Sequence, residues 1–282
     1  MNVSFDFTGQ TVIVTGAARG IGRVMAQRFA EAGALVVAAD REEEGLAETL
    51  ATLPSERVEA VAADITNEAE TARIIQTAVD RFGRLDVCIN NAAVAPHAAL
   101  LDERVEVWDR VYAVNCRGTF LMTQAAAEAM IAQKHGGRIV NFSSGVSRRG
   151  SPGAAAYASS RAAVESFTRV AAIELAPHNI LVNAISPGLI DTQPKPLPAH
   201  MAASLGARIP ALPLARPGAP EEVAATAMFL ASDAASYITG AVISVDGGAG
   251  IGSRFEGAII DDDPRYDWVT GRVPNVGTLD RH

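Results

Sequence analysis

The sequence contains few cysteines, few aromatic residues and no long apolar run. Its two cysteines, Cys88 and Cys116, are too few and too far apart for a disulfide framework. The five histidines show no spacing of metal ligands, so we expect no metal site. No apolar run reaches the roughly 18 residues that a membrane-spanning helix needs. These absences argue against a disulfide scaffold, a metalloenzyme and a membrane protein.

Lysine is also scarce: Lys134 and Lys195 are the only lysines, and the other basic side chains are arginines. The formal net charge of −8 disfavours binding to nucleic acid, which requires a basic surface. The segment from Met1 to Thr8 has neither the cationic start nor the apolar run of a secretory signal. We therefore expect a cytoplasmic protein with no nucleic-acid or membrane partner.

Apolar strand-like runs alternate with helical patterns along most of the 282 residues. Strands are expected at 11–15, 35–39, 58–63, 85–89, 138–142, 181–185 and 241–245. This alternation predicts an α/β fold, a doubly wound Rossmann-type parallel sheet flanked by helices on both faces. We expect one domain over 1–251 and an irregular C-terminal extension over 252–282. Phe255, Tyr266 and Trp268 give this extension apolar surface to pack on its own or a neighbouring subunit.

A glycine-rich turn follows the first expected strand and precedes a helix that continues to Ala32. The turn reads Gly16-Ala17-Ala18-Arg19-Gly20-Ile21-Gly22. Glycines in this setting allow a tight turn and let a pyrophosphate approach the free N–H groups of the helix N-terminus. The alternative is a tight turn with no ligand, and the flanking strand and helix favour phosphate binding.

Asp40 ends the second expected strand, where an acidic side chain can accept hydrogen bonds from the adenosine ribose. A carboxylate there repels the 2′-phosphate of NADP, so NAD is the preferred cofactor. Arg19 and Arg41 favour the opposite choice, since either could pair with that phosphate. Arg41 is better explained as an exposed residue at a helix start.

Polar residues follow other expected strands, at the edge where doubly wound sheets bind their ligands. Asp64, followed by Ile65, either caps the next helix or faces the adenine. Asn91 in the sequence Asn90-Asn91-Ala92-Ala93 either braces its loop or meets the cofactor. Ser143 and Ser144 follow the fifth expected strand, and Pro187 and Gly188 follow the sixth.

Asn115 lies in the middle of a long helical stretch, 103–133. Asparagine is a poor residue for a helix interior because its side chain competes for backbone hydrogen bonds. We therefore expect a local break there, at a functional site. Further on, the proline-rich segment 190–220, with a short helix near 199–208, is expected to form a lid.

The sequence Tyr157-Ala158-Ser159-Ser160-Arg161 lies in a helix that ends near Pro177. Side chains at i and i+4 lie one above the other on a helix, so Arg161 is expected beside Tyr157. A nearby cation stabilises a phenolate, which allows a tyrosine to act as an acid and base.

Taken together, these motifs resemble a short-chain dehydrogenase/reductase of the compact single-domain type. The resemblance covers about Phe7 to Gly248. It rests on T-G-A-A-R-G-I-G at 15–22, Asp64, N-N-A at 90–92, Asn115, Ser144, Tyr157, P-G at 187–188 with Thr192, and V-D-G-G at 245–248. The spacing between Ser144 and Tyr157 also matches the family, which favours Ser144 over Ser143.

The resemblance implies a role for each catalytic residue. Tyr157 exchanges a proton with the substrate oxygen while hydride passes between the substrate carbon and the nicotinamide. Ser144 hydrogen-bonds the same oxygen, and Asn115 anchors a water in a proton relay. Arg161 stands where the family has a lysine that binds the nicotinamide ribose and lowers the tyrosine pKa.

The resemblance also implies a cofactor site. The backbone at Ile190, with Thr192, would hold the nicotinamide carboxamide. The full set of expected cofactor-binding residues is Gly16, Arg19, Gly20, Ile21, Gly22, Asp40, Asp64, Ile65, Asn91, Tyr157, Arg161, Pro187, Gly188, Ile190 and Thr192.

Two residues depart from the family pattern. Ala93 replaces a glycine, at a cost of roughly 1 kcal/mol if the position needs a positive φ. Arg161 keeps the charge of lysine but is larger, planar and unable to release its proton. Two hypotheses follow: an active enzyme whose proton relay runs through water, or an NAD-binding protein that is weakly active or non-catalytic and serves regulation.

The substrate is less well defined by the sequence. A secondary alcohol or its ketone, such as a polyol, a sugar or a cyclic alcohol, fits the implied chemistry. Arg148 and Arg149 either meet an anionic group of the substrate or lie in a solvated loop, and His97 is open to both interpretations. The family also implies a homo-oligomer, with a tetramer favoured and a dimer possible.

Overall fold

The computed structural model describes residues 4–192 and 199–253 of the chain. Nearly all of the expected extension over 252–282, and part of the expected lid, lie outside these ranges. None of the described helices combines the length and the apolar character needed to cross a bilayer.

Seven parallel strands form one sheet, in the order β3-β2-β1-β4-β5-β6-β7. Their bounds are Thr11–Thr15 for β1, Leu35–Asp40 for β2, Val58–Ala62 for β3, Val87–Asn90 for β4, Gly137–Phe142 for β5, Ile180–Pro187 for β6 and Val242–Val245 for β7. The strand order reverses between β1 and β4, which is where doubly wound sheets bind ligands. All seven expected strands are present, and their ends differ from the expected ones by at most two residues.

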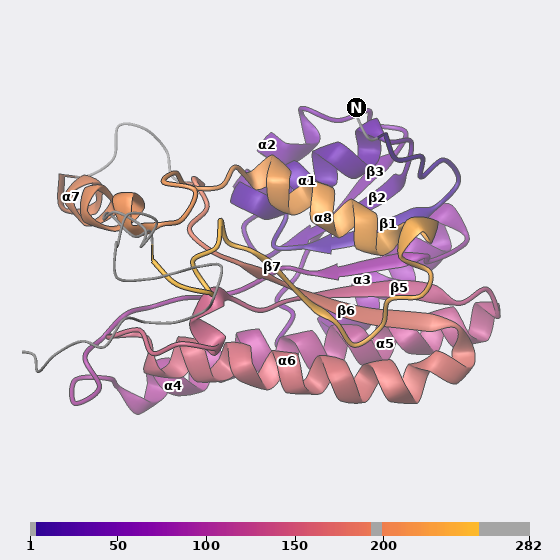
Figure 1. Cartoon of the computed structure of the whole chain (residues 1–282). Coiled ribbons are helices and arrows are strands. Elements are labelled where there is room, and N and C mark those ends of the chain that lie inside the picture. The colour runs from indigo at the N-terminus through magenta and orange to yellow at the C-terminus, as the bar shows by residue number, and fades with distance from the viewer. Residues whose placement is uncertain (1–3, 193–198, 254–282) are drawn as a thin grey trace, which may run out of the picture.

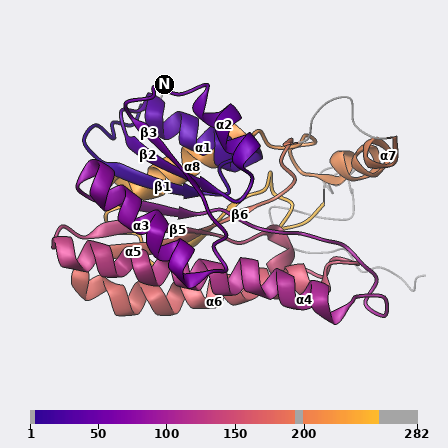
Figure 2. The ribbon, with the colours of Figure 1, turned by 180° about the vertical axis from the view of Figure 1, so that it is seen from behind.

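Helices cover both faces of the sheet (Figures 1 and 2). Helices α1, α2 and α8 lie on one face, and α3, α4, α5 and α6 lie on the other, while α7 projects to one side. Their bounds are Gly20–Glu31 for α1, Glu43–Leu50 for α2, Glu68–Phe82 for α3, Val105–Tyr112 for α4, Thr119–Gln133 for α5, Ala155–Leu175 for α6, Ala199–Arg208 for α7 and Pro220–Ala231 for α8. The predicted doubly wound α/β fold is confirmed.

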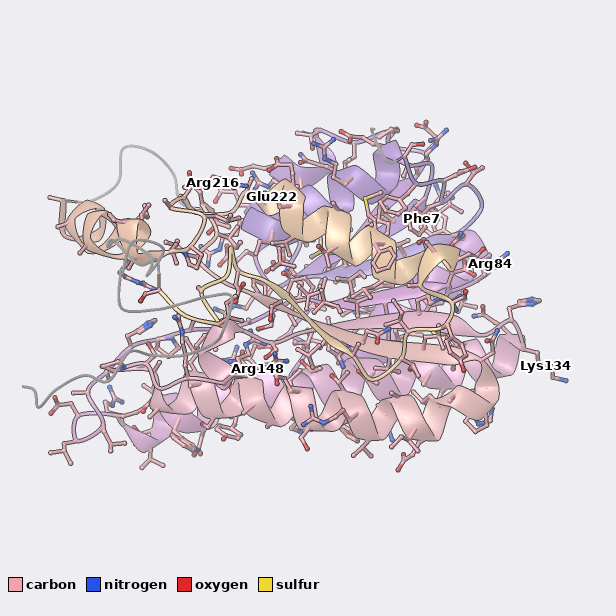
Figure 3. All side chains as sticks on the ribbon, in the orientation of Figure 1. Phe7, Arg84, Lys134, Arg148, Arg216 and Glu222 are labelled. Carbon is pink, nitrogen blue, oxygen red and sulfur yellow. The ribbon has the colours of Figure 1, made fainter. Side chains whose placement is uncertain are left out.

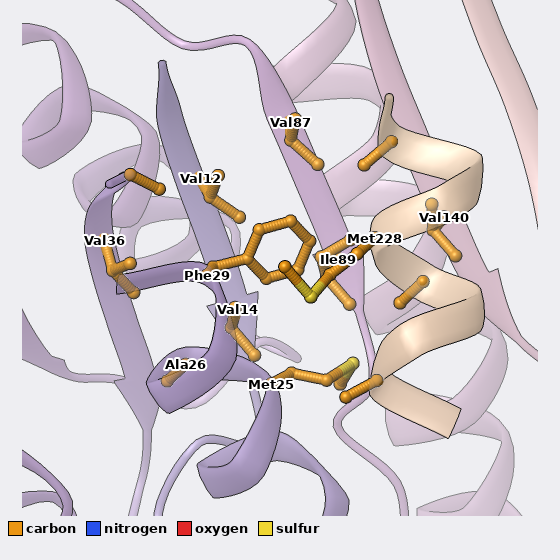
Figure 4. Packing of buried hydrophobic residues seen from close by; sticks show 14 of the residues in the cluster. Val12, Val14, Met25, Ala26, Phe29, Val36, Val87, Ile89, Val140 and Met228 are labelled. Atoms are coloured by element: carbon orange, nitrogen blue, oxygen red, sulfur yellow. The ribbon is translucent and has the colours of Figure 1, made fainter. Parts of the chain in front are cut away.

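Each face of the sheet has its own apolar core. On the first face, Phe29 and Met25 of α1 meet Met228 of α8 above the buried valines of β1 (Figure 4). On the second, Ile74 of α3 and Met122 of α5 pack against the alternate strand residues. Because both faces are covered, the strands read as continuous β-branched runs rather than alternating ones.

The structure decides two points about the loops that the sequence left open. The N-cap of α3 is Asn67, whose Oδ1 accepts a hydrogen bond from the Ala69 N–H at 2.9 Å, and not Asp64. Two residues, Ile65 and Thr66, separate Asp64 from this cap position, so Asp64 instead accepts from the Thr66 N–H in the turn before the helix. Ala93 is not among the described non-glycine residues with positive φ, which are Lys134, Asn179 and Ala215. The expected cost of replacing glycine at Ala93 therefore does not arise.

Candidate active site

A cavity of about 950 Å³ lies at the carboxyl ends of β1 to β4, beside the N-terminus of α1. Its lining includes the glycine-rich turn, Asp40, Asp64, Asn91 and Thr192. No side chain caps the N-terminus of α1, and its first turn contains no acidic residue. The free N–H groups and the positive end of the helix dipole therefore fit a pyrophosphate. The residues present thus suit a dinucleotide.

Glycine is required at position 22, where the turn itself and the loop after β4 both come close. A Cβ on Gly22 would lie 2.0 Å from the Gly16 carbonyl oxygen and 2.7 Å from Asn91 Nδ2. Asn91 Nδ2 donates to the Thr15 carbonyl at 2.9 Å, and the Asn91 N–H donates to Thr15 Oγ1 at 3.1 Å. Asn91 therefore braces the turn and also lines the cavity.

Asp40 is held in place by two backbone donors. Its Oδ2 accepts from the Ala18 N–H at 3.0 Å, and its Oδ1 accepts from the Glu42 N–H at 3.1 Å. These bonds orient the carboxylate at the cavity wall and leave lone pairs free for hydroxyl donors. Arg19 also lines the cavity, with 80% of its side chain exposed and its guanidinium 3.7 Å from Glu42.

Asp64 forms an ion pair that the sequence did not predict. Its Oδ2 accepts from Arg110 Nη2 of α4 at 3.0 Å, and Oδ1 accepts from the N–H and hydroxyl of Thr66 at 2.9 and 2.8 Å. Burial raises the pKa of Asp64, but the Thr66 bonds and Arg110 outweigh it, so the net pKa is lowered. The neighbouring Ile65 is buried and lines the cavity.

Asn115 lies in a π-helical segment, Ala113–Gly118, between α4 and α5. The side chain is fully buried, with Oδ1 accepting from the Val94 N–H and Nδ2 donating to the Val94 carbonyl, both at 3.0 Å. Nδ2 also donates to Ser160 Oγ of α6 at 3.0 Å. The predicted break is confirmed, and it lets one amide join the cavity-lining loop at Val94 to the helix of Tyr157.

Ser144 and Arg161 are both close enough to Tyr157 to influence its phenol, and the Arg161 guanidinium faces the Tyr157 ring. Ser144 follows β5, and Tyr157 lies in the first turn of α6, so the predicted cluster is brought together. Burial raises the pKa of the Tyr157 phenol, but the Arg161 charge and the two hydrogen bonds outweigh it, and the net pKa is lowered. This tyrosine is therefore prepared to lose and regain a proton.

Arg161 is buried against β5, with 2% of its surface exposed. Nη1 donates to the Phe142 carbonyl at 2.8 Å, while Nε has no hydrogen-bond partner. Its Cζ lies 5.2 Å from the centre of the Tyr157 ring, a cation–π separation. The guanidinium is thus anchored to the sheet at one nitrogen while it faces the phenol.

The sixth strand brings its polar end to the same edge. Gly188 donates its N–H to the Val245 carbonyl at 3.0 Å, and a Cβ there would lie 2.7 Å from the Asp246 Cα. Pro187 is the last residue of β6, and Ile190 pairs with Gly218. Thr192 closes a turn by donating its N–H to the Ile190 carbonyl at 3.0 Å.

Of the residues considered for substrate binding, the two arginines bond other groups of the protein and the histidine is exposed. Arg148 pairs with Glu165 at 3.3 Å, and Arg149 Nη1 donates to the Ala249 carbonyl at 3.1 Å. His97 is exposed, with Nδ1 near the Ala95 carbonyl. Sequence reasoning missed Glu165, although its place at i+4 from Arg161 put it on the same helix face.

A parallel doubly wound sheet with a dinucleotide-sized cavity and a serine–tyrosine–cation cluster defines a Rossmann-type oxidoreductase. The family model described as enoyl-(acyl carrier protein) reductase matches residues 16–250. The chain belongs to the short-chain dehydrogenase/reductase family, whose members use NAD or NADP, act on small molecules and are usually oligomeric.

Similar proteins of this family differ in their named substrates. The 3-oxoacyl-(acyl-carrier-protein) reductase FabG of Thermotoga maritima is 41% identical over 244 residues, 85% of this chain and 97% of that protein. The NAD-dependent glycerol dehydrogenase of Listeria innocua is 40% identical over 246 residues, 86% of this chain and 95% of that protein. The crystal structure of levodione reductase superposes with a TM-score of 0.82 at 32% identity, covering 87% of this chain and 99% of that one.

Proposed function

We propose that the protein transfers a hydride between NAD(H) and a secondary alcohol or ketone, with Tyr157 as the acid and base. The observation that carries this proposal is the Tyr157 hydroxyl, which is flanked by Ser144 and Arg161 and has a lowered pKa. Asn115 connects this cluster to the cavity, because its amide bonds both Val94 in the cavity wall and Ser160 on α6.

The side chains divide the proton chemistry between them. In the oxidation direction the Tyr157 phenolate accepts the proton of the substrate hydroxyl, and in reduction the phenol returns it. Ser144 donates a hydrogen bond to the same substrate oxygen and holds it beside Tyr157. The nicotinamide, when bound, supplies the acceptor or donor of the hydride. Arg161 stabilises the phenolate and cannot itself release a proton.

The relay water assigned to Asn115 remains a prediction. The Asn115 amide is already engaged with Val94 and Ser160, which supports a role in fixing the loop and α6. Because Arg161 keeps its proton, the relay in our proposal passes through water rather than through the cation.

We propose NAD rather than NADP because of Asp40. Its oriented carboxylate would accept hydrogen bonds from the adenosine ribose hydroxyls and would repel a 2′-phosphate. Gly16, Gly20, Ile21 and Gly22 would hold the pyrophosphate. Ile65 and Asp64 would meet the adenine, and Pro187, Gly188, Ile190 and Thr192 the nicotinamide end.

A second candidate is an NAD-binding protein that turns over weakly or not at all. One observation favours it: Arg161 uses Nη1 on the Phe142 carbonyl, so fewer donors remain for the nicotinamide ribose. A lysine side chain lacks the planar guanidinium group that would be shared here between the Phe142 carbonyl and the nicotinamide ribose.

Turnover assays separate the two candidates. NADH binding is measured by fluorescence, and turnover is measured with glycerol, sorbitol, cyclohexanol and 3-oxoacyl thioesters, or the matching carbonyl or alcohol. We expect NAD-linked turnover of at least one polyol or cyclic alcohol, and its loss in Y157F. Tight NADH binding without turnover of any compound would favour the non-catalytic protein.

We also propose a cytoplasmic homo-oligomer, with a tetramer favoured. Apolar side chains are exposed on three neighbouring helices: Trp108 on α4 at 36%, Phe120 on α5 at 44% and Ile173 on α6 at 77%. A second copy would remove this surface from water. Light scattering of the purified protein measures the mass of the assembly.

A further inference from the structure

Glu165 is a buried carboxylate on α6, one helical turn beyond Arg161, that the proposed proton chemistry does not use. Only 7% of its surface is exposed. Oε1 accepts from Ser143 Oγ at 2.8 Å and from Ser147 Oγ at 2.6 Å, and Oε2 accepts from Arg148 Nε at 3.3 Å. Figure 3 labels Arg148 beside α6.

These three partners lie on both sides of Ser144 in the chain. Ser143 is the residue before it, while Ser147 and Arg148 end the short turn after it. The Ser143 hydroxyl is also 3.3 Å from the Arg161 carbonyl, and the Ser144 carbonyl accepts from the Ser147 N–H at 2.9 Å. One carboxylate on a rigid helix therefore ties down the whole loop that carries Ser144.

Burying a carboxylate is unfavourable unless its oxygens receive hydrogen bonds or a countercharge. The groups that donate hydrogen bonds to the Glu165 carboxylate come from the Ser144 loop. These favourable contacts therefore exist only when that loop lies against α6. An apolar side chain at position 165 could pack against the same helix face but could not orient three polar groups. The arrangement therefore suits orientation of the loop better than stability alone.

We propose that Glu165 is a positioning residue that fixes Ser144 Oγ against the Tyr157 hydroxyl. The inference deepens the proposed function and rests on it, since Ser144 matters through the substrate oxygen and Tyr157. Hydrogen bonds on each side of a residue restrict its backbone, and displacements of about 1 Å from the reacting position can reduce a rate by about 100-fold.

The first test follows the ionisation of Tyr157 and needs no substrate. The ultraviolet absorbance of the phenolate is titrated for the protein, with the Y157F signal subtracted to remove the other tyrosines. We expect both E165A and S144A to move the Tyr157 titration to higher pH, because each removes the influence of the Ser144 hydroxyl on the phenol. Adding E165A to S144A should produce no further rise.

An electrostatic role for Glu165 predicts the opposite sign. Removing an anion near Arg161 and Tyr157 would favour the phenolate and lower its pKa. A titration that moves downward, stays unchanged, or rises equally in the S144A background would overturn the proposal. E165Q keeps an oxygen acceptor for the serine hydroxyls and should stay closer to the wild type than E165A. E174A, at an exposed glutamate of the same helix, is the matched control.

The second test uses turnover with whichever substrate the wild type accepts. We expect E165A to reduce kcat by about 10- to 100-fold, with the Kd for NADH unchanged and no additional loss in the S144A background. Should E165A fail to fold, S143A/S147A removes two donors and leaves the carboxylate, with the same expected rise in the Tyr157 titration. A wild type without turnover would count against the proposed function, while the titration would still decide the role of Glu165.

Discussion

Replacing Arg161 by methionine tests whether a buried guanidinium tunes Tyr157. We take the 5.2 Å from Arg161 Cζ to the Tyr157 ring centre as the charge separation. With an effective dielectric constant of about 20, the interaction is worth about 3 kcal/mol, which corresponds to an about 100-fold change in the phenolate fraction at a given pH. The lowered pKa of Tyr157 should therefore rise in R161M.

The assay is the pH profile of alcohol oxidation, together with the phenolate titration. Below the Tyr157 pKa the rate follows the phenolate fraction, so R161M should be about 100-fold slower at neutral pH. The rate should recover as the pH rises through the new pKa, because the phenolate then forms without help. The Phe142 carbonyl loses its donor in this variant, so a thermal melt accompanies the kinetics.

Two further variants make the reasoning refutable. R161K keeps the positive charge, so the pH at which the oxidation rate rises should stay nearly the same. The kcat of R161K shows whether the pocket is adapted to arginine or impaired by it. R169M, at an exposed arginine of the same helix, controls for the general loss of one cation. An unchanged pH profile in R161M would show that the Arg161 charge does not lower the Tyr157 pKa.

Three other changes have defined outcomes. D40S removes the charge that repels a 2′-phosphate, so the Kd should fall about tenfold for NADPH and rise about tenfold for NADH in fluorescence titrations. Arg216, through its hydrogen bonds, lowers the pKa of Glu222 to about 2 (Figure 3), so this pair stabilises the fold above the unfolded pKa of about 4.3. Its contribution is lost as the pH falls through 2, so the difference in denaturant midpoint between wild type and E222Q should narrow steadily below pH ~5. G22A should lower stability by about 1–3 kcal/mol and weaken NADH binding, whereas G206A, with no atom within 4 Å of its Cβ, should not; equal melting temperatures of these two variants would contradict the packing argument.

The fold was predictable because its signals are local and repeated. Buried parallel strands produce β-branched runs, and each is followed by a helix, so the sequence predicts the layers without any contact information. The break at Asn115 was also predictable, since an amide in a helix interior competes for backbone bonds. Its form, a π-helical segment whose amide reaches Val94 and Ser160, depends on tertiary contacts.

The parts of the site that the sequence did not predict are contacts between residues that lie far apart in the sequence. Arg110 meets Asp64 although the two are 46 residues apart, and no periodicity marks such a contact. A helix cap was one of the two roles predicted for Asp64 from its position after a strand, but Asn67, three residues later, occupies the cap. Glu165 was within reach of prediction, because Tyr157, Arg161 and Glu165 recur at every fourth residue of one helix.

The exchange of lysine for arginine beside Tyr157 also changes how the protein can be labelled. Reagents directed at primary amines find no target at position 161, and the described lysine, Lys134, ends α5 at the far side of the molecule from Arg148 (Figure 3). Coupling through amines should therefore leave Arg161 unmodified, which favours attachment of this protein to a solid support through lysine chemistry.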